Sequence, residues 1–384
     1  MKKEQLISQL NHGNSVVRLD ALKELMQMIR AGEIETPNKG NDVNIHTHTN
    51  YSFSPYSPTK AVWMAYAEGL KSVGIMDHDS ISGAREFLEA GKIVGILTTI
   101  GVECRLSMES TSLRDKVINA SDQKGMAYCT IHGVPHQRID EVLAFFEPYI
   151  EHRIVRNRKM VCRMNERMAP YGLSLDFEKD IVASSKYMNG GTITERHLLY
   201  ALAKKIVRKY GVGEGTVCFL ENELKVQMND KTRTILKDRQ NPFYEYDLLG
   251  VLKSSVMKEV YIPATDECPD VREVMRFANG IQACPCYVYS GGAEDAYLEE
   301  LFEVIKDVGF KAFSYMPTKI TSEQLARVRS LCERYGLIQL TGEDINSPRQ
   351  SFVCEAQRRP EFSILYDTAM DLIRHEHINS IDMA

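Results

Sequence analysis

Two histidines near the start of this chain have the spacing of a metal site. His46 and His48 are separated by one residue in the segment 43–48, and alternate residues of a strand point to the same face. Both imidazoles can therefore reach one ion, and neutral imidazole is the commonest metal ligand in proteins. His375 and His377 repeat the same spacing, but they lie in a charged segment of helical pattern. We interpret this second pair as having no metal role.

Further titratable residues follow other short apolar segments, each of which predicts a buried strand. Asp77, His78 and Asp79 come directly after the run Val73–Met76. We interpret Asp79 as a cap of the helix that follows, and His78 as facing the site. Four more candidates lie beside other predicted strands: Glu103, His132, Cys284 and Asp344. Their recurrence at successive strand ends predicts one shared site, because barrels of parallel strands build their sites at that end.

The elements that must position these side chains alternate between strand and helix. Apolar runs of strand length and helical patterns follow one another from residue 41 to 136, and again from 260 to 355. This alternation predicts an α/β protein with parallel strands. The predicted strands are 43–46, 73–76, 97–102, 126–131, 280–283, 311–315 and 337–341.

A mainly helical segment, residues 137–259, interrupts this alternation. Its first long helical pattern carries four arginines on one face, Arg153, Arg156, Arg163 and Arg167. A solvated face is the preferred interpretation, and a rim that contacts nucleotide or nucleic-acid phosphate is the alternative. Outside this insertion, residues 1–40 predict a helical extension and residues 356–384 a peripheral helical tail.

The composition limits the class of partner. A net charge of −5 and a pI near 6.1 provide no general attraction to nucleic acid or to an anionic membrane. An anionic substrate therefore needs a local positive site. No stretch reaches the ~20 apolar residues of a membrane span, and no apolar core of a signal peptide follows the N-terminal lysines. The nine cysteines are expected to be free thiols, and a cytoplasmic location is expected.

The ordered set of motifs resembles the polymerase and histidinol phosphatase (PHP) superfamily, and most of all its stand-alone phosphoesterases with a helical insertion. The resemblance spans roughly residues 42–350 and implies a distorted (β/α)7 TIM-like barrel built from 41–136 and 260–355, with 137–259 as the insertion. It rests on the stretches NIHTHTNYS, GIMDHDSISGAREF, TIGVEC, YCTIHG, GGTITERHLLYALAKK, GIQACPCY and GFKAFSYMPTKITSEQLARVRSLCERYGLIQLTGED.

The resemblance also implies metal ligands. Those of a first ion match His46, His48, Glu103 and Asp344. Glu103 would bridge to a second ion, held also by His132 and by the residue at 284. The family usually has histidine there, whereas this chain has Cys284, whose thiolate is a competent ligand for zinc or iron.

A third ion is expected to be weakly held or absent. His78 matches one of its ligands, but Ser54 and Asn346 stand where the family usually has Asp or His. Serine and neutral asparagine are poor ligands for a transition metal. We therefore expect two divalent ions, of Mn, Fe or Zn.

The expected activity is hydrolysis of a small phosphate ester, such as a nucleotide or sugar phosphate, by a metal-bridging hydroxide. His78 is expected to orient the substrate or protonate the leaving oxygen, and Asp77 to orient a histidine ligand. Arg196 and His197 match the part of the insertion that approaches substrate in the family, although the usual proline between them is missing. For Arg196, phosphate contact and a structural ion pair remain equal alternatives.

Two other functions remain open at this point. One is a degenerate family member that binds metal or a phosphorylated ligand without hydrolysing it, as the residues at 54 and 346 favour. The other is a nuclease acting on oligonucleotides, which the negative net charge disfavours. The sequence leaves the oligomeric state undecided, as well as whether residues 1–40 cover the barrel or form a dimer contact.

Overall fold

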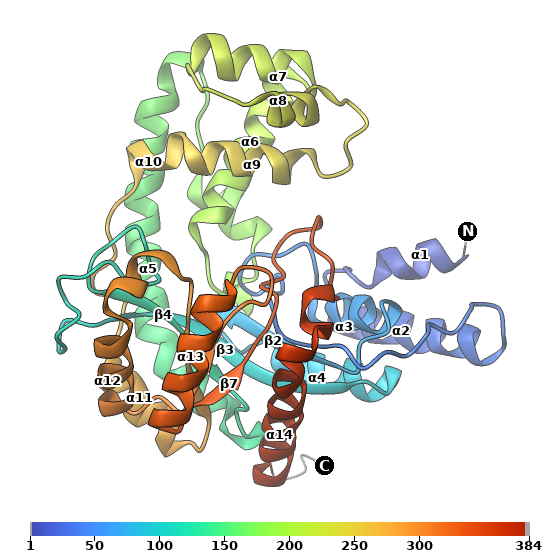
Figure 1. The fold of residues 1–384 in the computed structure, drawn as a ribbon. Coiled ribbons are helices and arrows are strands. Elements are labelled where there is room, and N and C mark those ends of the chain that lie inside the picture. Colours follow the sequence, from blue (N-terminus) through green and yellow to red (C-terminus); the bar gives the residue numbers. More distant parts are fainter. Residues whose placement is uncertain (1, 381–384) are drawn as a thin grey trace.

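A seven-stranded sheet organises the computed structural model, which describes residues 2–380 (Figure 1). Its strands follow one another across the sheet in chain order. The sheet is curled, so that residues far apart in the chain approach each other at one of its ends. The strands are β1 (Val43–Thr47), β2 (Ser72–His78), β3 (Leu97–Ser107), β4 (Met126–His132), β5 (Cys284–Val288), β6 (Ala312–Ser314) and β7 (Ile338–Leu340).

The prediction of an all-parallel sheet is wrong at one strand. β4 is antiparallel to both β3 and β5, whereas the other neighbouring pairs are parallel. A parallel connection usually needs a crossover helix, but the segment 108–125 forms only turns and bends. β3 also continues to Ser107, because residues 102–107 pair with β4. Glu103 therefore lies within β3 and not at its end.

The two edges of the curled sheet meet at one point. Ile345, in the loop after β7, forms a parallel bridge with Thr47 of β1. The amide of His48 donates to the carbonyl of Ile345 over 2.9 Å, and the amide of Ile345 donates to the carbonyl of His46 over 3.2 Å. This contact places the loop after β7 directly beside the two histidines. No continuous ladder between β1 and β7 closes the sheet within residues 2–380.

Helices cover the outside of the sheet, and the N-terminal helices pack on two of them. The helix α3 begins with Pro58 in its first turn, while Ser57 Oγ accepts from the amide of Lys60 as the cap. In the N-terminal extension, buried Arg18 pairs with Glu86 of α4. These elements are α1 (Lys2–Gln9), α2 (Ser15–Arg30), α3 (Pro58–Ala67), α4 (Ala84–Val94), α11 (Val271–Gly280), α12 (Leu298–Val308) and α13 (Ser322–Tyr335).

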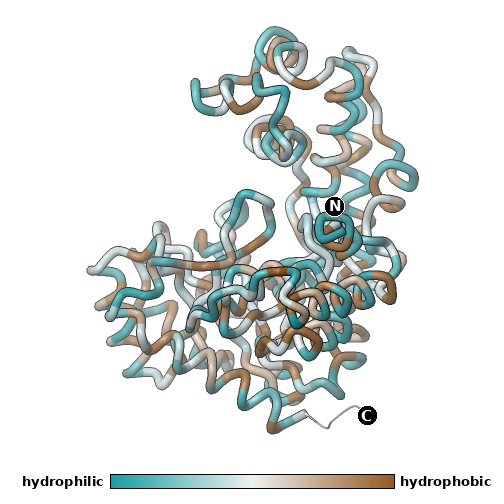
Figure 2. The backbone as a smooth tube through the Cα atoms, turned by 90° about the vertical axis from the view of Figure 1, so that its right-hand side faces the viewer, coloured by the Kyte–Doolittle hydropathy of each residue, from teal (hydrophilic) through white to brown (hydrophobic). Residues whose placement is uncertain are grey.

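The segment between β4 and β5 forms a helical body that stands above the sheet (Figures 1 and 2). It has its own cluster of buried apolar side chains, which includes Met160, Met164, Leu202 and Leu248. Phe53 enters this cluster from the loop after β1. Its main helices are α5 (Ile139–Met168), α6 (Glu195–Tyr210), α7 (Glu214–Cys218), α8 (Asp230–Lys237), α9 (Tyr244–Ser254) and α10 (Val256–Val260).

The C-terminal helix α14 (Ser363–Asn379) is not the peripheral tail that the sequence suggests. Its Glu376 is fully buried and accepts hydrogen bonds from Thr99 Oγ1 and from the amide of Ile100 in β3. The other carboxylate oxygen lies 3.0 Å from His136 Nε2. The buried carboxylate of Glu376 therefore anchors α14 to the sheet. Within residues 2–380, no helix is long and apolar enough to cross a membrane.

Candidate metal centre

The centre begins with the two histidines of the first strand. His46 lies in β1 and His48 directly after it; both are buried, and their ring centroids are 5.2 Å apart. Gly342 allows the loop after β7 to approach β1 closely, since a Cβ at this position would come within 2.5 Å of His46 Cβ. The backbone thus packs tightly around the pair, and the imidazoles face His78 at the end of β2 and Glu103 within β3.

Two neighbouring strands add a carboxylate and a third imidazole. His78 and Glu103 are direct partners in the parallel β2–β3 ladder. His78 Nδ1 lies 3.2 Å from Glu103 Oε2, and the Nε2 atoms of His46 and His48 lie 3.6 and 3.4 Å from the same oxygen. Glu103 is therefore shared by three histidines, as expected of a central ligand.

Asp344 completes the cluster from the loop after β7. Its Oδ1 lies 3.0 Å from His48 Nε2, and it also accepts a hydrogen bond of 2.7 Å from Asn346 Nδ2. Burial alone would raise the pKa of Asp344, but His48 outweighs it and holds this pKa well below its usual range. Burial opposes the charge on His48 as well, yet Asp344 and Glu103 raise the pKa of His48 to about 10.

The donor set of this cluster fits a divalent cation. The buried Nε2 atoms of His46 and His48 make no well-aligned hydrogen bond within the described residues, although both lie beside the carboxylates of Glu103 or Asp344, and buried polar groups without such bonds are costly. Donor atoms lie within 4.8 Å of one another in two groups, His46–His48–Asp344 and His48–His78–Glu103. Imidazole nitrogen together with carboxylate oxygen suits Zn, Fe or Mn. A cation here would accept the lone pairs of these nitrogens and neutralise the carboxylates beside them.

His132 and Cys284, the two further residues predicted for a second ion, do not belong to either group of converging donor atoms. His132 is buried, and its Nδ1 has no hydrogen-bond partner in residues 2–380. Burial, with the neighbouring charge of His46, lowers the pKa of His132 to about 3. Cys284 is its cross-strand partner, but the sequence prediction of a strand ending before Cys284 is wrong, because Cys284 begins β5. Its side chain belongs to an apolar cluster that contains Val43, Ile45 and Leu340.

Asp77 contacts the metal-binding cluster indirectly, through the hydroxyl of Ser52. The carboxylate is fully buried and accepts from the amide of Thr49 (2.7 Å), from Thr49 Oγ1 (2.5 Å) and from Ser52 Oγ (2.6 Å). Ser52 Oγ in turn lies 3.3 Å from His48 Nδ1. Asp77 therefore holds the loop 49–52 and fixes His48 indirectly. No sequence pattern pointed to Ser52.

The interpretation of Asp79 as a helix cap is wrong. The helix α4 begins at Ala84, and its cap position is Gly83. Asp79 instead pairs with Arg153 of α5 over 2.6 Å, and both side chains are buried. Burial raises the pKa of Asp79 to about 6, despite the opposing effect of Arg153.

The arginine face of α5 is solvated only in part, because Arg163 is exposed and Arg167 is half-buried. Arg156 is buried and pairs with Glu195 and Glu267. Farther along the helix, Arg163 donates to the carbonyl of Tyr261, and Arg167 pairs with Glu259. These side chains join the helix to other parts of the insertion and to the segment that leads back to the sheet, which explains why arginine recurs on this face.

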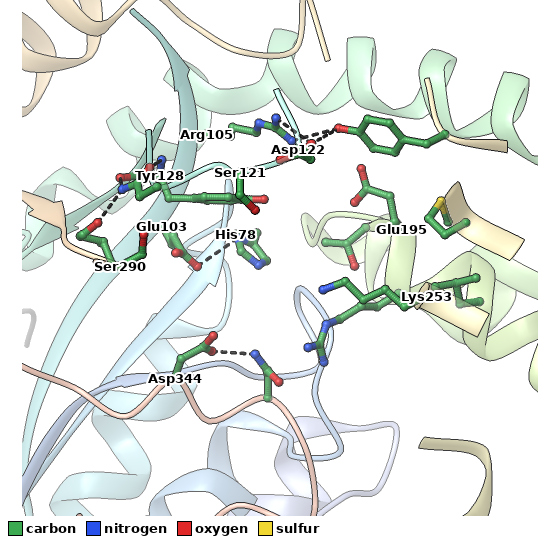
Figure 3. Close-up of a pocket in the computed structure, with 18 of the residues that line it drawn as sticks. His78, Glu103, Arg105, Ser121, Asp122, Tyr128, Glu195, Lys253, Ser290 and Asp344 are labelled. Carbon is green, nitrogen blue, oxygen red and sulfur yellow. Dashed lines mark hydrogen bonds and ion pairs between the residues drawn. The ribbon is translucent and has the colours of Figure 1, made fainter. Parts of the chain in front are cut away.

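A cavity of about 650 Å³ opens above the cluster, between the sheet and the insertion (Figure 3). His78, Glu103 and Asp344 line its base. The insertion supplies three cations to its wall that have no carboxylate partner in the described residues, although the Arg196 guanidinium lies 5.9 Å from the Phe53 ring centre. These cations are Arg196, Lys253 and Lys258. Lys253 and Lys258 were missed in the sequence, because nothing distinguishes them from surface lysines.

His197 does not face this cavity. Its Nδ1 accepts from the amide of Thr194 over 3.1 Å at the start of α6, and its ring packs edge-on against Phe53 with centroids 5.0 Å apart. The predicted catalytic role of His197 therefore has no geometric support, and we assign it to capping and packing. Arg196 is the member of this pair that lines the cavity.

Comparison with known proteins adds a decisive observation about these residues. The family model of the PHP domain matches residues 44–202, which include His46, His48, His78, Glu103 and His132. The chain carries a PHP domain. The resemblance inferred from the sequence motifs is thereby confirmed.

Curated relatives of this PHP domain match over short stretches only. A 5′-3′ exoribonuclease of Haemophilus influenzae is 37% identical over 70 residues, which are 18% of this chain and 26% of that protein. An error-prone DNA polymerase of Nocardia farcinica is 33% identical over 85 residues, 22% of this chain and 7% of that protein. The chain thus spans about a quarter or less of either relative.

Two solved structures share the fold over most of the chain. One, from Bifidobacterium adolescentis and assigned as a metal-dependent phosphoesterase, has a TM-score of 0.57 at 18% identity and covers 91% of this chain and 99% of that one. The other is an amidohydrolase of Chromobacterium violaceum with bound sulfate and no metal. Its TM-score is 0.53 at 15% identity, with 82% of this chain and 90% of that chain covered. The insertion is therefore part of the shared fold.

Proposed function

We propose that this PHP protein is a metal-dependent phosphoesterase that hydrolyses a small phosphate ester such as a nucleotide or sugar phosphate. One observation carries the proposal: a cluster of imidazole and carboxylate donors lies at the base of a cavity whose facing wall presents cations without carboxylate partners. A phosphate ester needs both features, because its charge must be neutralised at the reacting group and held in a fixed orientation. The size of the cavity suits a small ligand.

The residues that would hold metal are those whose donor atoms converge. We propose His46, His48, Glu103 and Asp344 for one divalent ion, with Glu103 shared with a second ion near His132 or His78. The prediction that Cys284 serves the second ion remains without support from its packing. Bound divalent ions lower the pKa of water and neutralise charge on phosphoryl oxygens.

Two ions fit this chain better than three. Asn346 already donates its amide to Asp344, and Ser54 Oγ accepts from the amide of Tyr56 over 3.4 Å. Both side chains therefore act within the protein's own hydrogen-bond network. The donor atoms of His46, His48 and Asp344, and of His78 and Glu103, nevertheless converge, and this retention of the main ligands favours an active enzyme over a degenerate one.

The protein's own groups would bind and orient the substrate. Arg196 can offer two parallel N–H donors to a phosphate, which suits its planar geometry. Lys253 would add a point charge from α9. The side chain of His78 is 28% exposed and borders the cavity beside Glu103, where we infer that it serves the second ion and faces the bound ester.

We further propose that residues 41–136 and 260–355 form a PHP-type barrel whose closure depends on the Thr47–Ile345 contact, with 137–259 as an insertion domain. In this arrangement the helices α1 and α2 of the N-terminal extension and the C-terminal helix α14 support the barrel from outside. The substrate would be bound between barrel and insertion, so both would contribute to specificity.

A second candidate function is nuclease activity on short oligonucleotides. It is favoured by the match of 70 residues to a 5′-3′ exoribonuclease. An oligonucleotide would have to extend beyond the cavity, and its binding would weaken steeply with salt.

The test is a hydrolysis assay after removal of metal with a chelator and reconstitution with Mn²⁺, Fe²⁺ or Zn²⁺. Substrates would be an aryl phosphate, nucleoside monophosphates, sugar phosphates and a short oligoribonucleotide. We expect turnover of a small ester that requires metal and is weakened in Arg196→Ala. The matched control is Arg208→Ala, an exposed arginine of the same helix. Absence of turnover on every ester with every metal would contradict the proposal, and cleavage of the oligoribonucleotide alone would favour the nuclease.

A further inference from the structure

A buried ion pair joins the insertion to the turn that follows β2. Arg153 Nη2 lies 2.6 Å from Asp79 Oδ2, and the two side chains are 8% and 3% exposed. Removing one partner of such a pair leaves an uncompensated buried charge, which is strongly destabilising. A surface pair at this place would be unremarkable, but a pair buried beside His78 constrains the backbone on which that histidine stands.

The backbone of Asp79 is held in an unusual conformation. Its φ is +51°, in the left-handed region that residues with a side chain adopt at a cost. The amide of Asp79 donates to the carbonyl of Glu103 over 2.8 Å, which aligns the end of β2 with β3. A conformation of this kind persists only when the surroundings impose it, and the ion pair to Arg153 is the strongest contact that Asp79 makes.

The helix α5, which carries Arg153, is held rigidly within the insertion. Asn157, one turn from Arg153, donates its side-chain amide to the carbonyl of Ile193 over 2.6 Å. Met160 and Met164 bury the same helix in the apolar core of the insertion. Arg153 therefore projects from a rigid element onto a strained turn, and the insertion can fix the geometry at the end of β2.

We propose that Arg153 is a positioning residue for His78, acting through Asp79. By holding the turn after β2, it keeps His78 Nδ1 against Glu103 at the base of the cavity. The inference rests on the proposed function insofar as His78 and Glu103 belong to a metal centre. It adds that the insertion shapes this centre as well as covering the substrate.

The competing explanation is that Arg153 contributes only stability. Arg156 provides the matched control, because it lies on the same helix, is equally buried and pairs with carboxylates, but does not contact residues 77–79. Its replacement should lower stability in the same way without moving His78. Metal affinity and thermal unfolding of the metal-free protein together separate the two explanations.

The experiment is calorimetric titration of chelator-treated full-length protein with Mn²⁺. We expect Arg153→Met, and the milder Asp79→Asn, to weaken Mn²⁺ binding by about tenfold to a hundredfold, the range found for residues that orient metal ligands. Arg156→Met should lower the unfolding temperature but leave Mn²⁺ affinity unchanged. In a His78→Ala background, Arg153→Met should cause no further weakening, because its effect passes through that histidine.

The inference is overturned if Arg153→Met and Asp79→Asn bind Mn²⁺ like the unmodified protein, if Arg156→Met weakens binding equally, or if the Arg153→Met effect persists without His78. If Arg153→Met does not fold, Asp79→Asn decides alone. Failure of the proposed function has a different signature: the unmodified protein would bind Mn²⁺ and hydrolyse no ester, while the affinity differences between variants would remain.

Discussion

His48 Nε2 lies 3.0 Å from Asp344 Oδ1, although one residue follows the first strand of the sheet and the other follows the last. The curl of the sheet brings these two ends together, and the bridge between Thr47 and Ile345 fixes their approach. The centre therefore depends on the tertiary fold and not on a local motif. Anything that loosens this contact should reduce metal binding before it unfolds the chain.

The serine between Asp77 and His48 gives a first prediction. Ser52→Ala removes the hydroxyl that bonds Asp77 and contacts His48 Nδ1, so the imidazole loses its orientation. We expect Mn²⁺ affinity to fall by about tenfold or more. Thr49→Val is the control, because Thr49 Oγ1 also donates to Asp77, whereas the hydroxyl beside His48 Nδ1 is that of Ser52. Equal metal affinities of the two variants, measured by calorimetry, would show that Ser52 serves only the loop.

A second prediction concerns the cation that α9 supplies. Lys253→Ala should raise KM for a phosphate ester by about tenfold, since a hydrogen bond from a charged donor contributes about 1.5 kcal/mol or more. Mn²⁺ affinity should not change, because Lys253 faces the substrate and not the ligands. Lys204→Ala, an exposed lysine of α6 that does not line the cavity, is the control. An unchanged KM in steady-state kinetics would remove Lys253 from the binding site.

The acid sensitivity of the fold gives a third prediction. Burial would raise the pKa of Glu195, but Arg156 and Arg153 outweigh it and lower this pKa from 4.5 to about 2. A carboxylate with a depressed folded-state pKa contributes stability above its unfolded value, and this contribution is lost as the pH falls toward the folded value. It amounts to about 2–3 kcal/mol by the usual linkage between pKa and free energy.

The measurement is urea unfolding of metal-free protein between about pH 6 and pH 3. The unmodified chain should lose more stability over this window than Glu195→Gln, and the two curves should converge toward the acid end. Parallel curves across the window would show that Glu195 has no special pairing with the arginines of α5.

The sequence indicated much of the centre because its ligands end or follow buried strands. His46, His48, His78 and Asp344 lie where parallel strands share one edge of a sheet, and this rule needs no tertiary information. Glu103 was identified as well, although it lies inside a longer strand. Its place in the cluster follows from the parallel pairing of β3 with β2, which sets Glu103 beside His78. The continuation of β3 beyond Glu103 depends on antiparallel pairing with β4, which the sequence does not reveal.

Contacts between distant elements were not predictable in the same way. Arg153 shows helical spacing that fits a solvated face equally well, and only the fold reveals that Asp79 lies opposite it. The sequence predicts Cys284 directly after a strand, because the apolar run before it is short and ambiguous. The positive φ of Gln282, +65°, ends the preceding turn, so the strand begins at residue 284.

The central claim is that His46, His48, Glu103 and Asp344 bind a divalent ion, and calorimetric titration of chelator-treated protein with Mn²⁺ tests it most directly. The unmodified chain should bind two ions, and Asp344→Asn should lose the tighter one while keeping its fold by circular dichroism. Glu343→Gln, which removes the adjacent carboxylate that bonds Thr318, should bind like the unmodified chain. Absence of Mn²⁺ binding in the unmodified protein, or equal binding in Asp344→Asn, would contradict the account.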